Sequence, residues 1–190
     1  MTERFSFGGR FLHAVAYGAF GIYREVYQQE FGFMILSLQQ TAAGRIGIAE
    51  CEGALTNLYF ESDPLPGDAE IGETAFLREA FRQLQAYFQG GLREFDLPLD
   101  PRGTPFMREV WRHVAAVPYG RTASYRDVAV AAGNPKAVRA VGMANRLNPV
   151  PVFIPCHRII GSDGKLTGYR GGLPLKERLL DLERCRCAGG

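Results

Sequence analysis

A Pro/Gly-rich stretch from Gly90 to Pro105 divides this chain of 190 residues into two halves of opposite charge. Residues 1–100 carry 7 basic side chains against 14 acidic ones, whereas residues 101–190 carry 15 against 6. Because proline and glycine interrupt regular structure where the composition also changes, we predict a domain junction there. The formal net charge of +2 therefore conceals an acidic half and a basic half. The basic half suits a polyanionic partner; the alternative is two domains of opposite charge that attract each other.

The overall composition is that of a globular protein, with 46% hydrophobic and 22% charged residues. This excludes a disordered chain, a collagen-like chain and a coiled coil. No apolar run approaches the roughly 20 residues that a membrane span needs. The four cysteines form no evenly spaced framework, so we expect reduced thiols and a cytoplasmic protein. Cys185 and Cys187 form either a weak metal or redox pair or an incidental feature of a fraying C-terminus.

Residues 1–33 form a segment that is unusually rich in aromatic residues. Part of it faintly resembles a signal peptide, but His13 and two glycines interrupt the apolar stretch and no cleavage site follows. Two interpretations stay open. Either the segment is an additional packing element, or Met34 is the true start of the protein.

From Met34 onward the first half has the pattern of a small sheet with one helix. Three short apolar runs predict strands, at residues 34–40, 45–51 and 55–60. The first two strands are expected to form a hairpin through residues 41–44, and residues 62–72 are expected to form a loop. Residues 73–88 predict an amphipathic helix, because their apolar side chains recur every three or four residues. These side chains are Leu77, Phe81, Leu84 and Phe88.

The second half is predicted to be mainly helical. A first helix is expected over residues 106–117. Ser124 and Asp127 form a capping box that begins a second helix, and a glycine ends it. Asn134 is expected to cap a third helix that continues to about Leu147. Two helices joined by such a short turn predict a helix-turn-helix. The apolar face of the second helix is expected to comprise Val128, Ala131 and Ala132.

The third helix presents three faces at 100° per residue. Val138 and Val141 share one face, which is expected to pack in the core. The opposite face is basic and carries Lys136, Arg139, Met143 and Arg146. A stripe of small residues lies beside it and comprises Ala137, Ala140 and Ala144. Such a helix either contacts DNA phosphates or is an ordinary solvated face, and the basic charge of this half favours DNA.

An apolar run over residues 152–160 is interrupted by a Pro-Cys-His-Arg sequence, which begins at Pro155. Polar side chains in apolar surroundings need partners, so Cys156 is a candidate nucleophile and His157 a candidate base. Adjacent residues on a strand point to opposite faces, so the two cooperate only if the backbone bends, for which Pro155 is suited. The alternative is a buried, inert cysteine beside a hydrogen-bonded histidine.

Glu183 lies in a predicted last helix over residues 175–183 and is the candidate to orient His157 in a Cys–His–carboxylate relay. The alternative is a surface carboxylate, although a helix C-terminus is an unfavourable place for negative charge. Between the cysteine and this helix lies a tight turn at residues 161–164. The Gly-rich residues 165–172 follow it and are expected to fold back as the lip of a pocket.

Five segments of the second half carry a combined motif. They are Tyr119–Tyr125, Gly133–Gly142, Asn148–Pro151, Ile154–Arg158 and Thr167–Gly172. Together they resemble the methylated-DNA–protein-cysteine methyltransferases, which are the O6-alkylguanine-DNA alkyltransferases. The resemblance is continuous from Phe106 to Glu183, and the combination is far more specific than any single piece.

The resemblance implies an α+β fold of two domains. Residues 34–100 would form a small N-terminal antiparallel-sheet domain of the ribonuclease-H-like type, with the linker starting at about residue 90. Residues 101–190 would form a mostly helical DNA-binding and catalytic domain that contains the helix-turn-helix. In residues 1–33 we recognise no resemblance to the family.

The same resemblance implies DNA repair by direct damage reversal. The alkyl group of O6-methylguanine, and of O4-methylthymine as a further substrate, would pass irreversibly to Cys156, so that each molecule reacts once. The partner would be double-stranded DNA that contains O6-alkylguanine, bound through the minor groove with the damaged base flipped out. The protein would act as a monomer that binds no membrane and needs no cofactor or metal. If the source is bacterial, it would be associated with the nucleoid. A single cysteine before residue 156 cannot build the zinc module that some family members carry.

By match to the family, Cys156 is the acceptor, His157 its water-mediated base and Glu183 the partner of the histidine. Asn148 would support the site, and Tyr125 would help to rotate the nucleotide out and assist guanine as the leaving group. The implied pocket residues are Pro151, Tyr169 and Arg170.

The implied DNA contacts lie mostly on the helix-turn-helix, where Arg139 would take the place of the flipped base in the stack. They are Tyr125, Arg126, Asn134, Lys136, Ala137, Arg139, Arg146 and Ser162. Three other classes of protein remain alternatives. The first is an alkyltransferase-like lesion-binding protein without transfer, although such proteins lack the acceptor cysteine. The second is a cysteine hydrolase that uses Cys156, His157 or His113, and Asn148. The third is a transcriptional regulator with an incidental cysteine.

Overall fold

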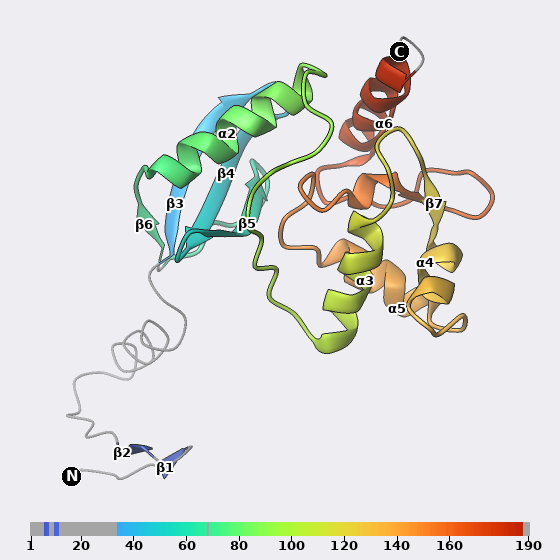
Figure 1. Ribbon diagram of the computed structural model, residues 1–190, viewed down its shortest axis with the longest axis horizontal. Coiled ribbons are helices and arrows are strands. Elements are labelled where there is room, and N and C mark those ends of the chain that lie inside the picture. The colour runs from blue at the N-terminus through green and yellow to red at the C-terminus, as the bar shows by residue number, and fades with distance from the viewer. Residues whose placement is uncertain (1–5, 8–9, 12–33, 68, 188–190) are drawn as a thin grey trace.

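The computed structural model describes residues 6–7, 10–11, 34–67 and 69–187, and it places a sheet with one helix beside a group of helices (Figure 1). Within residues 1–33, the described part is limited to two short paired strands, β1 (Ser6–Phe7) and β2 (Arg10–Phe11). The two interpretations of that segment therefore lie outside the described residues. The mixed α+β fold that the sequence predicts is confirmed.

The sheet has four strands in the order β5-β4-β3-β6. They are β3 (Ile35–Thr41), β4 (Gly44–Cys51), β5 (Ala54–Phe60) and β6 (Glu70–Ile71). β3, β4 and β5 pair antiparallel, which confirms the three predicted strands and the first hairpin. β6 lies in the stretch that was expected to be a loop and pairs parallel with β3. With only two residues, β6 is too short to leave a periodic pattern in the sequence.

The predicted first-half helix is α2 (Ala75–Phe88), which lies across one face of the sheet (Figure 1). Thr74 caps it, since its side chain accepts a hydrogen bond from the Leu77 amide at 3.1 Å. Leu77, Phe81 and Leu84 are buried in the core that the helix shares with the sheet. Burial of each such side chain stabilises the domain by about 1.5–3 kcal/mol.

The segment after α2 is extended but is not a free linker. The Leu55 amide donates to the Pro98 carbonyl at 2.9 Å, and the Asp100 amide donates to the Leu55 carbonyl at 2.9 Å. The chain therefore runs alongside β5 before it enters the second half. This pairing fixes where the helical part begins relative to the sheet.

The second half contains four helices, a short 3-10 turn and a pair of two-residue strands within the described residues. The elements are α3 (Pro105–Ala115), β7 (Ala123–Ser124), α4 (Tyr125–Ala131), α5 (Val138–Arg146), η1 (Cys156–Arg158), β8 (Ile159–Ile160) and α6 (Leu173–Cys187). β7 and β8 pair in parallel. α6 extends to Cys187, and the expectation of a fraying C-terminus stays a prediction. Among the described residues, no helix has both the length and the apolar character that crossing a bilayer requires.

α4 and α5 form the predicted helix-turn-helix. Ser124 caps α4, and the reciprocal bonds with Asp127 form the expected capping box. Gly133 follows α4 with a φ of +76°, a conformation that glycine adopts without strain. The expectation that Asn134 caps the next helix is wrong, because α5 begins only at Val138. The Asn134 side chain instead accepts from the Lys136 amide at 3.3 Å and holds the turn.

The predicted faces of α4 and α5 need correction. In α4, Ala129 is buried and Ala131 is exposed. In α5, Val138 is 36% exposed and Ala144 is buried. The cause in α5 is the packing of α3, since the Trp111 indole donates to the Ala144 carbonyl at 2.8 Å. This contact places the buried face at Val141, Ala144 and Asn145, with i, i+3 and i+4 spacing.

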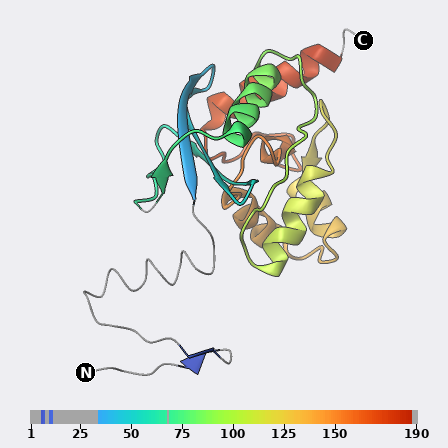
Figure 2. The same cartoon turned by 60° about the vertical axis from the view of Figure 1, so that its left-hand side comes forward.

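The two halves share one continuous hydrophobic core, and α6 passes behind α2 in the view of Figure 2. A hydrogen bond from Tyr87 of α2 to Glu183 of α6 joins the two helices. The Leu58 amide of β5 donates to the Pro149 carbonyl at 2.8 Å. Arg170 pairs with Asp63 at 3.1 Å and donates to the Leu58 carbonyl. The edge of the sheet therefore supports the loop that precedes Cys156.

Candidate active site

Cys156 lies at the start of η1, and its side chain is buried, with the residue 3% exposed. The backbone does bend at Pro155: residues 156–158 form a single 3-10 turn, and the strand β8 begins only at Ile159. Cys156 and His157 are therefore not held on opposite faces of a strand. The geometric condition for their cooperation is met.

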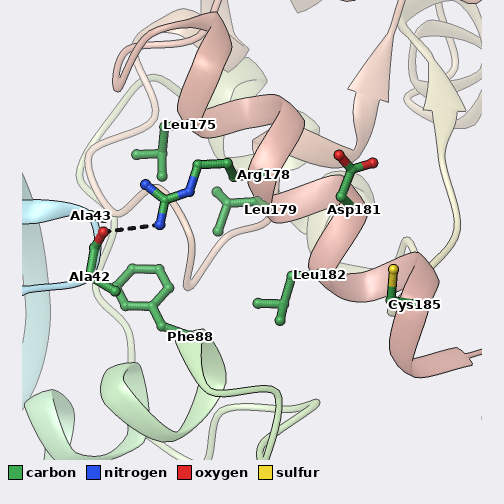
Figure 3. Close-up of a pocket in the computed structure, with 9 residues that line it drawn as sticks. All are labelled: Ala42, Ala43, Phe88, Leu175, Arg178, Leu179, Asp181, Leu182 and Cys185. Atoms are coloured by element: carbon green, nitrogen blue, oxygen red, sulfur yellow. Dashed lines mark hydrogen bonds between the residues drawn. The ribbon is translucent and has the colours of Figure 1, made fainter.

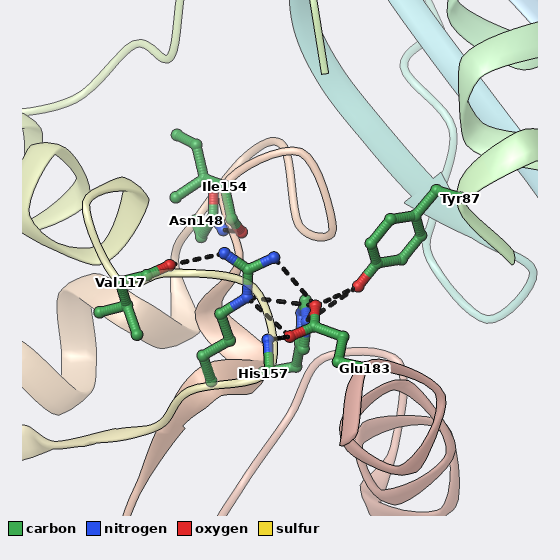
Figure 4. Close-up of polar contacts among 8 residues, drawn as sticks. Tyr87, Val117, Asn148, Ile154, His157 and Glu183 are labelled. Atoms are coloured by element: carbon green, nitrogen blue, oxygen red, sulfur yellow. Dashed lines mark hydrogen bonds and ion pairs between the residues drawn. The ribbon is translucent and has the colours of Figure 1, made fainter. Parts of the chain in front are cut away.

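Glu183 is not a surface carboxylate, because it is 0% exposed and accepts hydrogen bonds from four residues (Figure 4). They are the Tyr87 hydroxyl at 2.5 Å, His157 Nε2 at 2.9 Å, the Gly120 amide at 2.8 Å, and Arg158 Nε and Nη2 at 2.9–3.1 Å. The side chains of α2 and α6 thus meet at one carboxylate beside the Cys-His-Arg turn.

The charges of this cluster follow from its contacts. Burial raises the pKa of Glu183, but hydrogen bonds from His157 and Arg158 outweigh it and lower the pKa to about 2. Burial lowers the pKa of His157, against the opposing effect of Glu183. At neutral pH the cluster therefore contains a carboxylate, a guanidinium and a neutral imidazole. The guanidinium of Arg158 compensates the buried charge of Glu183 and is fixed by the Val117 carbonyl at 2.6 Å.

The tautomer of His157 follows from the ionised Glu183. A carboxylate only accepts hydrogen bonds, so Nε2 carries the proton that it donates to Oε1. Nδ1 is then an acceptor, and this atom is buried without a hydrogen-bond partner in the described structure. A base needs a free ring nitrogen of this kind.

Burial raises the pKa of the Cys156 thiol. Asn148, Lys176 and Arg170 lower it, but less than burial raises it. Its cationic neighbours therefore do not bring the pKa of this thiol below its ordinary value. The thiol is protonated at neutral pH, so a nucleophilic reaction requires a base that removes its proton as the bond forms.

Asn148 holds the turn that leads to the cysteine. Its Oδ1 accepts from the Val150 amide at 3.1 Å, and its Nδ2 donates to the Ile154 carbonyl at 2.9 Å. The turn contains Val152 with a φ of +76°, which is strained for a β-branched residue. These contacts are consistent with the supporting role that the family resemblance implies for Asn148.

The Gly-rich segment packs over the reactive centre. Tyr169 has a buried hydroxyl without a partner in the described structure, and its ring lies edge-on at 6.3 Å from that of His157. Thr167 donates to the Tyr125 hydroxyl at 3.2 Å. Lys176 is buried, and its ammonium donates to the Thr167 and Ile159 carbonyls at 2.8 and 2.6 Å. The segment is thereby tied to β8 and to α4.

The other two expected pocket residues, Pro151 and Arg170, lie around the turn that leads to Cys156. Pro151 is buried in the turn that Asn148 holds. Arg170 is half-buried and donates to the Asn148 carbonyl at 3.1 Å, besides its contacts with Asp63 and Leu58. Its guanidinium joins the sheet to the reactive centre and contributes to the site through the position of Asn148.

The candidate DNA contacts lie on an exposed face of α4, α5 and the adjoining turns. The exposed residues are Arg126, Asn134, Lys136, Arg139, Arg146 and Ser162, and Tyr125 and Ala137 are half-buried. Met143 lies on the same face of α5 and is 53% exposed. The small-residue stripe is interrupted, because Ala144 faces the core. The basic face itself is solvent-accessible, as a DNA contact requires.

A cavity of about 300 Å³ lies elsewhere, between α6, the end of α2 and the first hairpin (Figure 3). Phe88, Leu179 and Leu182 line it, and the exposed thiol of Cys185 borders it. None of its lining residues belongs to the Cys156 centre. His113, the alternative base of a cysteine hydrolase, bonds to Glu109 at 3.0 Å on α3.

Sequence reasoning missed three residues that complete the centre: Tyr87, Arg158 and Lys176. The sequence does indicate a role for Arg158, because an arginine in an apolar run needs a buried anion as its partner. It indicates none for Lys176, since a Lys-Glu pair in a helix is typical of a solvated surface. Tyr87 occupies the amphipathic helix of the other half, and its hydroxyl function appears only when the two halves meet.

Known proteins resemble both halves. Residues 22–101 match the family model of the 6-O-methylguanine DNA methyltransferase ribonuclease-like domain, and residues 105–185 match that of its DNA-binding domain. The match begins at residue 22, so the expectation that residues 1–33 lack any resemblance to the family is wrong for residues 22–33. A methylated-DNA–protein-cysteine methyltransferase of Methanosarcina barkeri is 48% identical over 154 residues, which are 79% of this chain and 97% of the relative. The chain belongs to this family.

A constitutive methylated-DNA–protein-cysteine methyltransferase of Bacillus subtilis is 45% identical over 76% of this chain and 92% of its own length. The crystal structure of Mycobacterium tuberculosis OGT in complex with DNA is also similar, with a TM-score of 0.76 and 43% identity. It covers 80% of this chain and 94% of the solved chain. As a member of the methyltransferase family, the chain therefore shares its fold with a protein that has been seen bound to DNA.

Proposed function

We propose that this protein repairs O6-alkylguanine in double-stranded DNA by one irreversible transfer of the alkyl group to Cys156. The observation that carries the proposal is the buried Cys156–His157 turn, whose histidine has one nitrogen fixed by Glu183 and the other free. A basic, exposed face on the helix-turn-helix supports DNA as the partner. Membership of the family supports the reaction type.

The reaction is a displacement at the alkyl carbon. The Cys156 sulfur forms a bond to the methyl carbon while the O6–carbon bond breaks, and its electron pair stays on the purine. The thiol proton passes through water to Nδ1 of His157 and finally to the purine, so that guanine leaves neutral. The product is S-methylcysteine, a thioether whose carbon–sulfur bond is stable in water. Each molecule therefore acts once.

Glu183 prepares His157 for this proton transfer. Its negative charge stabilises the imidazolium that forms, while Arg158 and Tyr87 hold the carboxylate in place. Because burial lowers the pKa of His157, the imidazole is neutral at physiological pH and is ready to accept a proton. We propose that Asn148 stabilises the turn that positions Cys156.

The DNA side of the proposal is minor-groove binding with the damaged nucleotide flipped out. Arg139 would fill the stack, Tyr125 would assist rotation, and Tyr169 would line the pocket. Flipping costs a few kcal/mol of unstacking, which contacts of the basic face offset. We also propose that one monomer binds one lesion. A duplex blocked by a minor-groove ligand should then not be repaired, and the complex should sediment with one protein per duplex.

The direct test is mass spectrometry after incubation with a duplex that contains one O6-methylguanine. We expect one added methyl group on the Cys156 peptide, and none in Cys156→Ser. The reaction should stop at one methyl per protein. An unchanged mass after complete exposure would overturn the proposal and favour a lesion-binding protein without transfer. Repeated turnover of an ester or peptide substrate would indicate a hydrolase instead.

A further inference from the structure

Tyr87 is the residue through which the acidic half contacts the charged cluster beside Cys156. It lies on α2 and is buried, and Figure 4 shows its hydroxyl directed at Glu183. The hydroxyl donates to Oε1 of that carboxylate at 2.5 Å. The other described donors to the carboxylate all belong to the basic half: His157, Arg158 and the Gly120 amide. The acidic half therefore adds one hydroxyl to a carboxylate that the basic half otherwise binds by itself.

Tyr87 and His157 donate to the same oxygen atom. Nε2 of His157 lies 2.9 Å from Oε1 of Glu183, and the Tyr87 hydroxyl lies 3.2 Å from the same Nε2. The three atoms form a triangle whose shortest side is the bond from tyrosine to carboxylate. Donors to one oxygen share its negative charge, so each donor weakens the attraction that the others experience. The Tyr87 hydroxyl therefore competes with His157 for Oε1.

The direct contact between the Tyr87 oxygen and Nε2 is the weaker of the two tyrosine contacts. At 3.2 Å it has the upper length of a hydrogen bond, whereas 2.5 Å is typical of a hydroxyl that donates to a carboxylate. Burial and the negative charge of Glu183 raise the pKa of Tyr87, so the hydroxyl keeps its proton. That single proton is directed to the carboxylate. Tyr87 therefore acts on His157 mainly through Glu183.

We propose that Tyr87 is a positioning residue through which the acidic half weakens the attraction between Glu183 and His157. By binding part of the charge of Oε1, the hydroxyl helps to keep the imidazole neutral and able to pass a proton on from Nδ1. This inference rests on the proposed transfer to Cys156 and gives the acidic half a part in its proton transfer. A merely structural Tyr87, which only fixed α2 in place, would change the rate by the same factor at every pH.

Other ionisable groups surround His157, and a substitution at Tyr87 leaves their chemistry in place. Burial lowers the pKa of His157, Glu183 opposes this, and the positive charges of Arg158 and Lys176 add to it. The buried side chains of α3, which also packs against the Cys-His-Arg turn, are apolar. The groups that face the imidazole or its bonded partners are Glu183 and Lys176 of α6, Cys156 and Arg158 of η1, Tyr119 before α4, and Tyr169 of the Gly-rich segment.

The test is the pH profile of single-turnover methyl transfer from O6-methylguanine in a duplex, for the wild-type protein and for Tyr87→Phe. A saturating excess of protein removes the contribution of DNA binding to the rate. The variant keeps the ring and loses only the hydroxyl, so Glu183 should attract the imidazolium more strongly. We expect the acid limb of the profile, where protonated His157 cannot act as a base, to move to higher pH by about one pH unit. Above both midpoints the two rates should agree within about threefold.

A second measurement needs no reaction. NMR of the isotopically labelled His157 side chain, in the protein without DNA, should show a pKa that is higher in Tyr87→Phe than in the wild type. Tyr59→Phe is the matched control, because it removes a hydroxyl from β5 of the same half. It should leave both the pH profile and the titration of His157 at their wild-type values.

An unchanged midpoint with a rate lowered equally at every pH would overturn the inference, because a purely structural role predicts that result. A shift of the acid limb to lower pH would also overturn it, since the direct contact with Nε2 would then outweigh the competition for Oε1. A wild-type protein that takes no methyl group from the duplex would instead overturn the proposed function. In that case the NMR titration would still decide whether Tyr87 acts on His157.

Discussion

Glu183 is the residue on which the buried charge balance of the site depends. It receives bonds from Tyr87, His157, Gly120 and Arg158, and its removal would leave the Arg158 guanidinium buried without a counter-charge. We expect Glu183→Ala to lower the free energy of unfolding by about 3–5 kcal/mol, measured by urea denaturation.

Glu177→Ala is the control for this prediction. Glu177 is exposed on the same helix, so its loss should change the free energy of unfolding by about 0.5 kcal/mol or less. Similar effects of the two substitutions would contradict the buried pairing of Glu183 with Arg158.

The same carboxylate predicts how stability depends on pH. The pKa of Glu183 is about 2 in the folded protein, against an ordinary value of 4.5. Between these values the unfolded chain binds more protons, so stability rises with pH across this window and is lost as the pH falls through it. The contribution is roughly 3 kcal/mol, from about 1.4 kcal/mol per pKa unit. Urea titrations at several pH values should show a flatter dependence for Glu183→Gln, and parallel curves would refute this assignment.

The elements that the sequence predicts well are those with their own periodicity or caps. α2 and the strands β3 to β5 have strong apolar patterns, and α4 has a complete capping box, so local chemistry decides them. α5 is less predictable, because the contact of Trp111 with Ala144 turns its buried face away from Val138. Tertiary packing thus overrides the periodicity of a single short helix.

The residues of the candidate site also fall into those that the sequence predicts and those that only the structure identifies. Cys156, His157 and Glu183 can be identified from the sequence. The first two are polar residues in an apolar run, which require partners, and Glu183 is a carboxylate at a helix C-terminus, where negative charge is unfavourable. Tyr87 and Lys176 cannot, since both lie on helices where a polar side chain on the buried face looks like an imperfection in the apolar pattern. Their polar atoms acquire partners only when α2 and α6 pack around the Cys-His-Arg turn.

The exposed face of α5 predicts how DNA and free base should differ as substrates. Arg139 is exposed and is proposed to fill the stack only when a base leaves a duplex. Arg139→Ala should therefore slow methyl transfer from a duplex by tenfold or more, on the order of the unstacking cost, and leave the reaction with free O6-benzylguanine nearly unchanged. Arg78→Ala, on α2 of the acidic half, is the control and should change neither rate. Equal losses of Arg139→Ala on both substrates would exclude the stacking role.

At the scale of the whole molecule, the acidic half and the basic half supply different parts of the site, and they meet at the carboxylate of Glu183. The half with 7 basic and 14 acidic residues supplies Tyr87 and supports the loop before Cys156. The half with 15 basic and 6 acidic residues supplies the reactive turn and the exposed basic face. A small net charge with one basic face permits contact with DNA along that face, while the acidic half limits non-specific attachment elsewhere.

This division predicts the salt dependence of DNA binding. If Lys136 and Arg146 each neutralise one phosphate, then Lys136→Ala together with Arg146→Ala should reduce the slope of log affinity against log salt by about two, at roughly 0.9 per contact. Removing two exposed charges from the acidic half, by Arg78→Ala and Arg82→Ala, changes the net charge equally. That control should leave the slope unchanged, because those side chains lie on α2 and away from the basic face. Fluorescence anisotropy with an undamaged duplex at several salt concentrations measures both slopes. The same reduction in both double variants would mean that net charge, rather than the face of α5, attracts DNA.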